Sequence, residues 1–128
     1  MTGPRLDTIN KLFTAVNDYD AALFASLVTE DAVLIMGGYE VHHGIDGIYH
    51  GKSGAKDVIR DVARIFTSWA TTCHRIIGEG DAAAIEWSVI ITDFGGGQGK
   101  VDACAVADFD GDLIKRLRVY WRPQDMGD

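Results

Sequence analysis

The sequence has few cysteines and no long apolar run, and each shortage excludes a class of protein. Its 128 residues include two cysteines, Cys73 and Cys104, whose spacing fits neither a zinc site nor a redox motif. We therefore predict two buried thiols and no disulfide bridge. No apolar run approaches membrane-spanning length, so no membrane contact is expected. The segment from Met1 to Arg5 lacks the charged-then-apolar plan of a secretory signal, which favours a cytoplasmic protein.

Positively charged residues are also few, which argues against a nucleic-acid partner. The chain has 12 lysines and arginines against 19 aspartates and glutamates, so its net charge is −7 and it repels phosphate. The feature most similar to a basic stripe is a set of four basic residues that alternate with apolar residues near the end of the chain. We interpret it as a solvated or subunit-facing strand surface. Its members are Lys115, Arg116, Arg118 and Arg122.

The length and overall composition are those of one ordinary globular domain. Hydrophobic residues make up 47% of the chain and charged residues 24%. A chain of this length can bury a core without metal or disulfide staples. We predict a single domain over residues 1–128.

The clearest pattern is an alternation of apolar and polar residues between Gly80 and Pro123. Glycine-rich residues 95–99 and the Asp110-Gly111-Asp112 sequence interrupt it, and both are turn signals. The alternation has a period of two, which predicts antiparallel strands that each have one apolar face. The three predicted strands are Ala82–Thr92, Lys100–Phe109 and Ile114–Arg122.

The first half of the chain carries apolar residues at helical spacing. This spacing predicts three amphipathic helices, with Asp20 as the N-cap of the second. Two further strands are expected at Ala32–Met36 and Trp69–Ile77. Because each helix and the sheet offer one apolar side, they must bury each other, which is an α+β architecture. The predicted helices are Pro4–Asn17, Ala21–Val28 and Ser53–Phe66.

The segment Tyr39–Gly51 is rich in histidine, glycine and tyrosine. Neighbouring residues in a strand face opposite ways, so His42 and His43 cannot both reach one metal ion without help. We therefore favour a mobile hairpin or flap over a metal site, and we expect neither a metal nor an organic cofactor.

Four short motifs fall at the junctions between the predicted elements: Leu27–Val33, His50-Gly51-Lys52, Gly78–Asp81 and Phe109–Ile114, the last leading to Val119-Tyr120-Trp121. Together with the element order, they resemble the nuclear transport factor two-like superfamily. Its branch of SnoaL-like polyketide cyclases, ketosteroid isomerases and limonene epoxide hydrolases is the most similar. The resemblance implies a cystatin-like curved antiparallel sheet, a conical α+β barrel wrapped around three helices in the N-terminal half. It also implies a homodimer formed through the convex face of the sheet.

The same resemblance implies that the catalytic acids of these relatives are missing here. The isomerase general base would fall at Met36, the carboxylic acid of isomerases and cyclases at Ala105, and the isomerase tyrosine near Leu12. None of these side chains can move a proton, which general acid–base catalysis requires. The epoxide hydrolase residues would also fall on apolar positions: Leu34, Met36, Trp87, Val89 and Val119.

The apolar face of the sheet is expected to line a ligand cavity with aromatic walls. In register with the isomerases, Thr72 and His74 would face this cavity, and Tyr49 could reach it from the flap. His74 is then the candidate proton carrier, because imidazole titrates near neutral pH. A surface or capping role for His74 stays open. The remaining predicted ligand-binding residues are Met36, Trp87, Val89, Ala105, Val119 and Trp121.

Three functional hypotheses follow. The first is a SnoaL-like enzyme that cyclises, isomerises or dehydrates a hydrophobic, aromatic or polyketide-like substrate. The second is a non-catalytic protein that binds a small hydrophobic ligand in the same cavity. The third is a dimerising scaffold whose helices fill the space completely, as a close-packed core requires.

Overall fold

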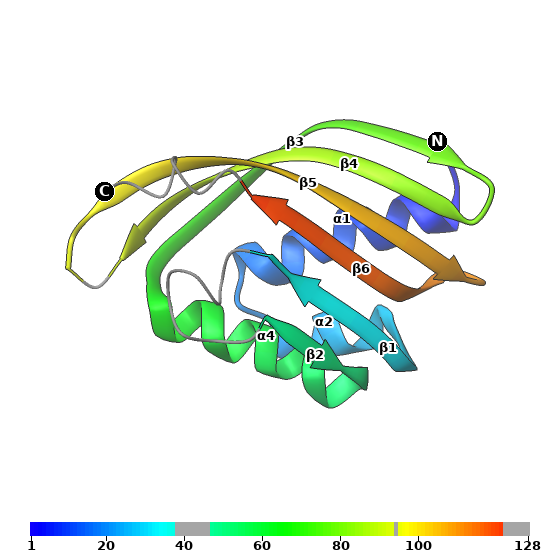
Figure 1. The fold of residues 1–128 in the computed structure, drawn as a ribbon, viewed down its shortest axis with the longest axis horizontal. Coiled ribbons are helices and arrows are strands. Elements are labelled where there is room, and N and C mark those ends of the chain that lie inside the picture. The colour runs from blue at the N-terminus through cyan, green and yellow to red at the C-terminus, as the bar shows by residue number, and fades with distance from the viewer. Residues whose placement is uncertain (38–46, 94, 122–128) are drawn as a thin grey trace.

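The computed structural model describes residues 1–37, 47–93 and 95–121, which form one sheet and the helices that pack on it (Figure 1). This arrangement confirms the predicted α+β fold. The helices are α1 (Pro4–Asn17), α2 (Ala21–Ser26) and α4 (Gly51–Ile65). The strands are β1 (Val28–Met36), β2 (Ile48–His50), β3 (Phe66–Glu79), β4 (Ala82–Asp93), β5 (Gln98–Asp110) and β6 (Leu113–Trp121).

The six strands form a curled sheet in the order β2-β1-β6-β5-β4-β3. The long strands β3, β4 and β5 arch over the helices, which all lie on one side of the sheet (Figure 1). Neighbouring strands run antiparallel except β1 and β6, which are parallel. Because β2 and β3 stay at the two edges, the sheet is curved but not closed into a barrel.

Helix α2 is shorter than predicted, and the sheet explains the difference. The backbone N–H of Leu23 donates to Asp20 Oδ1 over 3.0 Å, which confirms Asp20 as the N-cap. The helix ends at Ser26 and not at Val28. Val28 instead pairs with Ile114 of β6, so strand β1 begins four residues earlier than the predicted Ala32.

Helix α4 begins two residues before the predicted Ser53. It starts at Gly51, whose φ of +69° suits glycine, and a Cβ there would lie 2.7 Å from the carbonyl oxygen of Glu30. Just before it, Ile48–His50 pairs with β1 as strand β2. Residues 39–46 of the predicted flap lie outside the described residues.

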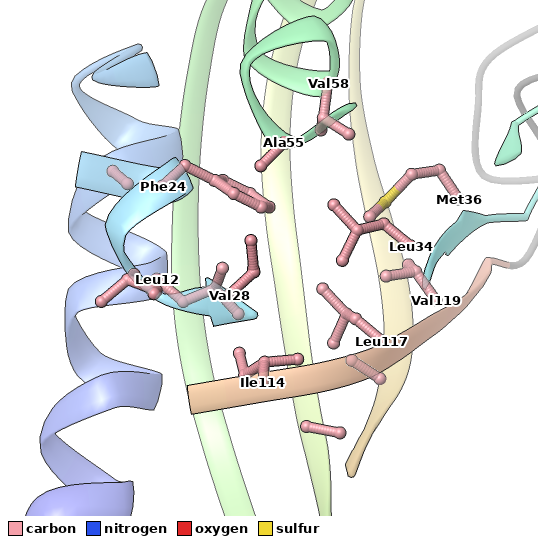
Figure 2. Close-up of a cluster of buried hydrophobic side chains, with 14 of the residues drawn as sticks. Leu12, Phe24, Val28, Leu34, Met36, Ala55, Val58, Ile114, Leu117 and Val119 are labelled. Atoms are coloured by element: carbon pink, nitrogen blue, oxygen red, sulfur yellow. The ribbon is translucent and has the colours of Figure 1, made fainter. Parts of the chain in front are cut away.

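The core lies between the helices and the concave face of the sheet. Figure 2 shows Phe24 and Val58 from the helices facing Leu34, Leu117 and Val119 from the sheet. All five side chains are buried, and burying each such side chain contributes about 1.5–3 kcal/mol to folding. The predicted burial of the apolar stripes against the apolar sheet face is therefore confirmed.

Arg5 anchors the start of helix α1 to two turns of the sheet. Its guanidinium donates to the carbonyl oxygens of Gly111 (2.8 Å) and Gly80 (3.2 Å) and pairs with Asp81 at 2.9 Å. The same group lies 5.3 Å from the centre of the Phe109 ring. Arg5 therefore ties the start of α1 to two β-turns and fixes the direction of the helix over the sheet.

The two cysteines are unbridged, but the prediction that both are buried is wrong. Cys73 is exposed and Cys104 is half-buried. Cys73 lies on β3, which is an edge strand, so one side of its backbone has no neighbouring strand to cover it. Among the described helices, none is both long and apolar enough to span a membrane.

Candidate functional site

An apolar cavity of about 50 Å³ lies between the helices and the concave face of the sheet. All three described helices contribute to it, and none of the lining residues in the described part of the chain is charged. The helices supply Leu12, Phe13, Val16, Phe24, Val58 and Val62, and the strands supply Met36, Trp69, Thr71, Ile85, Trp87, Ala105, Leu117, Val119 and Trp121.

The cavity is small for a ligand site. A volume of 50 Å³ is about a third of the roughly 150 Å³ apolar cavity that holds benzene in an engineered protein. A ligand the size of an aromatic ring must therefore displace side chains on entry. Met36 is suited to this movement, because methionine has an unbranched and adaptable side chain.

Aromatic rings dominate one wall of the cavity. The ring of Trp87 lies 5.9 Å from Phe13, 6.3 Å from Trp69 and 5.5 Å from Trp121, measured between ring centres. Trp69 and Trp121 are 5.7 Å apart in an edge-to-face arrangement. These are favourable separations for aromatic pairs, and the same faces can stack on a planar ligand.

Thr71 and Trp69 are two of the cavity-lining residues that carry a polar group. The hydroxyl of Thr71 donates to Asn17 Oδ1 over 2.8 Å, and the same oxygen accepts the Thr71 backbone N–H over 3.0 Å. The indole Nε1 of Trp69 is buried and has no hydrogen-bond acceptor among the described residues. Since buried polar groups in native proteins are nearly always paired, this N–H is an unusual feature of the core.

The structure brings together most, but not all, of the residues predicted to bind a ligand. Met36, Trp87, Ala105, Val119 and Trp121 line the cavity. Val89 is fully buried but is not part of the wall. Tyr49 is also buried away from the cavity, where its hydroxyl donates to Asp61. Whether these residues bind a ligand stays a prediction.

The expectation that Thr72 and His74 face the cavity is wrong. Thr72 pairs with Ser88 of β4, on the outer face, whereas Thr71 lies in the cavity wall. An irregularity between Cys73 and Arg75 leaves His74 outside the regular pairing, and its Nε2 lies 2.8 Å from Ser88 Oγ. The register carried over from the isomerases was off by one residue, which turns every side chain to the opposite face.

His74 instead borders a broad, shallow groove of about 550 Å³ on the outer face of the sheet. The groove is more polar than the interior cavity, since its lining includes Glu86, Asp102 and Tyr120. Nearby on the same face, Ile90 is 54% exposed and Tyr120 is 53% exposed. The outer face is therefore mixed in character, as the alternating sequence pattern indicates.

A buried acid that the sequence interpretation missed lies on α4. Asp61 is 5% exposed, and its Oδ2 accepts a hydrogen bond of 2.7 Å from the Tyr49 hydroxyl. Arg64 and Arg60 approach its Oδ1 at 3.4 and 3.5 Å. The candidate residues named from the sequence did not include Asp61. Its spacing of three residues from Val58 was the available signal, because residues three apart share a helix face.

Metal ligation finds no support in the described ranges. Within residues 1–37, 47–93 and 95–121, no group of three or more histidine, cysteine, aspartate or glutamate side chains could hold a metal ion. His42 and His43, which raised the question, lie outside these residues.

Solved structures share this fold over nearly the whole chain at low sequence identity. An NTF2-like protein of unknown function from Burkholderia pseudomallei has a TM-score of 0.88 at 14% identity, with 98% of this chain and 95% of that chain covered. IdmH from Streptomyces antibioticus, a proposed polyketide cyclase, has a TM-score of 0.79 at 20% identity, with coverages of 95% and 94%. RV0760c from Mycobacterium tuberculosis, solved in complex with estradiol-17beta-hemisuccinate, has a TM-score of 0.77 at 19% identity, with coverages of 97% and 98%.

The sequence matches none of the curated proteins with which it was compared. The sequence profile described as the SnoaL-like domain, in contrast, matches residues 9–117. This range runs from within α1 to within β6 and so includes most of the cavity wall. The chain therefore belongs to the SnoaL-like domain family.

Proposed function

We propose that this protein binds a small hydrophobic molecule in the interior cavity. The observation that carries the proposal is the wall itself, in which three tryptophans and two phenylalanines line the space and no described lining residue is charged. Such a site favours planar apolar ligands by burial and by stacking. Membership of the SnoaL-like family and a structural neighbour solved with a steroid derivative support the same proposal.

Binding without turnover is better supported than catalysis. General acid–base chemistry needs a titratable group within hydrogen-bond reach of the substrate, and the described residues that line the cavity include no acid, base or histidine. His74, the proton carrier predicted from the sequence, lies on the opposite face of the sheet. The non-catalytic alternative is therefore our first proposal.

Calorimetric titration with toluene, a single apolar ring, tests this function. We expect saturable binding to the native protein and affinity weaker by about tenfold or more in Ala105→Leu, because the added carbons occupy the cavity. Ala84→Leu is the matched control, because Ala84 pairs with Val106 and Ile77 on the outer face and its substitution should leave the affinity unchanged. If toluene binds to none of the three proteins, the filled-core scaffold replaces this proposal.

The second candidate function is a SnoaL-like cyclase, isomerase or dehydratase that acts on an aromatic or polyketide-like substrate. One observation favours it. Tyr49 and Asp61 form a buried hydrogen-bonded pair, and Asp61 lies between Val58 and Val62, which both line the cavity. A small rotation of either side chain during ligand entry could bring a proton acceptor to the wall. Geometry in an empty site does not exclude such a role.

Hydrogen exchange at a carbonyl compound separates the two candidates. Isomerisation, aldol cyclisation and dehydration of a hydroxyketone can all begin with removal of a proton next to a carbonyl group. We therefore expect an enzyme of this type to speed the exchange of the methyl hydrogens of acetophenone in D2O, measured by NMR. Catalysis would be supported if the protein speeds the hydrogen exchange and the Asp61→Asn variant does not. If the exchange is no faster than in buffer, ligand binding remains as the only proposed function.

We also propose that two copies pair through the outer face of the sheet. The exposed Ile90 and Tyr120 provide apolar area there, and Arg118 and Asp108 provide complementary charges on neighbouring strands. Ultracentrifugation at increasing concentration should show a dimer that Ile90→Asp converts to a monomer. A native monomer at high concentration would contradict the proposal. Location in the cytoplasm and a single domain over residues 1–128 remain predictions.

A further inference from the structure

We infer that the edge of strand β3 pairs with the same edge of a second copy of this chain, which extends the sheet across two molecules. The contact is formed by residues 75–79, the last part of β3. In Figure 1, this part lies at the upper margin of the sheet and ends at the arrowhead. Among the described strands, the one neighbour of β3 is β4. The contact is therefore distinct from the outer-face dimer and does not depend on ligand binding.

The two parts of β3 differ in how their edge is protected. An edge strand presents backbone N–H and C=O groups with which a strand of another molecule can pair. In the first part, Asn17 Oδ1 accepts the backbone N–H of Thr71 over 3.0 Å. The irregularity at His74 then interrupts the strand, which also hinders pairing. Neither feature covers residues 75–79, where pairing with β4 is regular.

The backbone of residues 75–79 offers two positions for pairing. In an antiparallel pair, the N–H and C=O groups of alternate residues are directed to the neighbouring strand. The two-residue turn after Glu79 directs the backbone groups of Glu79 to β4. Counting back from it, Ile76 and Gly78 direct their backbone groups away from β4. A strand of a second copy can therefore bond to both.

The side chains of this stretch complement themselves when two copies run antiparallel. Arg75, Ile77 and Glu79 alternate along β3, so they share one face of the sheet, and all three are exposed. A twofold axis at Ile77 places Arg75 opposite the partner's Glu79 and Ile77 opposite the partner's Ile77. The same axis aligns Ile76 with the partner's Gly78, so the outward backbone groups also meet.

Both side-chain contacts favour association. Opposite charges directly across two strands attract each other, and neither Arg75 nor Glu79 forms an ion pair with another described residue. Ile77 is 51% exposed, and pairing would cover it. Five residues from each copy are about a quarter or less of the number in a stable interface. We therefore expect a weak contact, which forms at a higher concentration than the outer-face dimer.

Exchanging the two charges tests the register. Sedimentation equilibrium of the native protein at increasing concentration should show a last step that doubles the mass. Arg75→Glu and Glu79→Arg should each weaken this step about tenfold or more, because each places like charges opposite each other. The double variant Arg75→Glu/Glu79→Arg should restore it. Lys11→Glu, which changes the charge equally at an exposed position on α1, is the matched control and should have no effect.

A cysteine on the twofold axis gives an independent readout. Ile77 and the partner's Ile77 would form a non-hydrogen-bonded pair, whose Cα atoms lie about 4.5 Å apart, within the range of a disulfide bond. In a Cys73→Ser/Cys104→Ser/Ile90→Asp background, which removes both native thiols and disrupts the outer-face dimer, Ile77→Cys should form a disulfide-linked dimer on oxidation with copper phenanthroline. Lys11→Cys in the same background should form about tenfold less.

The outcomes separate edge pairing from a general effect of charge. Glu79→Arg lowers the net negative charge, so weaker repulsion between whole molecules would strengthen association, whereas edge pairing predicts that it weakens. A double variant no better than the single ones, or equal cross-linking of Ile77→Cys and Lys11→Cys, would overturn the inference. Neither result would affect the proposed ligand site or the outer-face dimer, which have their own tests.

Discussion

The Nε2 atom of His74 lies 2.8 Å from the hydroxyl oxygen of Ser88, on the face of the sheet opposite the cavity. Ser88 is itself buried, because the imidazole covers it. The pair therefore belongs to the outer surface and to any subunit contact made there. It cannot exchange a proton with a molecule held between the helices and the sheet.

We expect His74→Gln to leave the interior affinity for toluene within about twofold of the native value. The amide of glutamine can still bond to Ser88, so the outer face should stay intact. Calorimetric titration measures the effect beside Ala105→Leu, which should lose affinity. A loss in His74→Gln as large as that in Ala105→Leu would mean that His74 reaches the cavity after all.

Loss of the Tyr49 hydroxyl should destabilise the fold. Tyr49→Phe removes a 2.7 Å hydrogen bond to the buried Asp61 carboxylate, and leaving a buried group short of its partner costs about 1–3 kcal/mol. Urea denaturation measures the free energy of unfolding. Tyr120→Phe is the matched control, because Tyr120 is 53% exposed and should lose little. Equal losses in the two variants would contradict a structural role for the Tyr49–Asp61 bond.

Lys52 should matter more for stability than its neighbour one turn along α4. Its Nζ donates to the carbonyl oxygens of Ala25 (3.0 Å) and Val28 (2.8 Å), where α2 ends and β1 begins. We expect Lys52→Met to lower the free energy of unfolding by about 1.5–3 kcal/mol, the range for hydrogen bonds from charged groups. Lys56→Met, at an exposed position, should change it by less than about 0.5 kcal/mol. Equal losses in the free energy of unfolding for the two variants would rule out a stabilising role for the Lys52 hydrogen bonds.

The pH at which the Cys73 thiol becomes reactive should be higher than for an ordinary cysteine. Cys73 is exposed, but partial desolvation by its neighbours raises the pKa of its thiol above the ordinary value of 9.0, and a backbone hydrogen bond from Arg75 offsets part of the rise. A raised pKa leaves less thiolate at a given pH, and the thiolate is the reactive form. In a Cys104→Ser background, iodoacetamide at pH 8.5 should therefore alkylate Cys73 more slowly than a peptide of residues 70–76. An equal or faster rate would contradict the shift.

The part of the fold predicted from the sequence is the part with strong alternation. In β4 and β6, isoleucine, valine, leucine and tryptophan alternate with polar residues, and the predicted inward positions Trp87 and Val119 are in the cavity wall. Asp20 was also predicted correctly, because a capping aspartate depends on local geometry alone.

Strand β3 shows where that approach fails. Its central residues, Ala70 to Cys73, are small or polar on both sides, so no apolar alternation over them fixes which side faces inward. A register borrowed from relatives then placed His74 and Thr72 inside, and the irregularity at His74 could not be read from the sequence. Asp61 was missed for a different reason, since its burial depends on the Tyr49 hydroxyl that arrives from another element.

The existence of an open apolar cavity is tested most directly by a crystal structure of the protein under xenon pressure. A space of about 50 Å³ can accept one xenon atom, which binds in dry apolar cavities. We expect a single strong peak in contact with Met36, Trp87 and Ala105, and its loss in Ala105→Leu. A native crystal with no xenon at these residues would show that the core is filled and would contradict the proposed binding site.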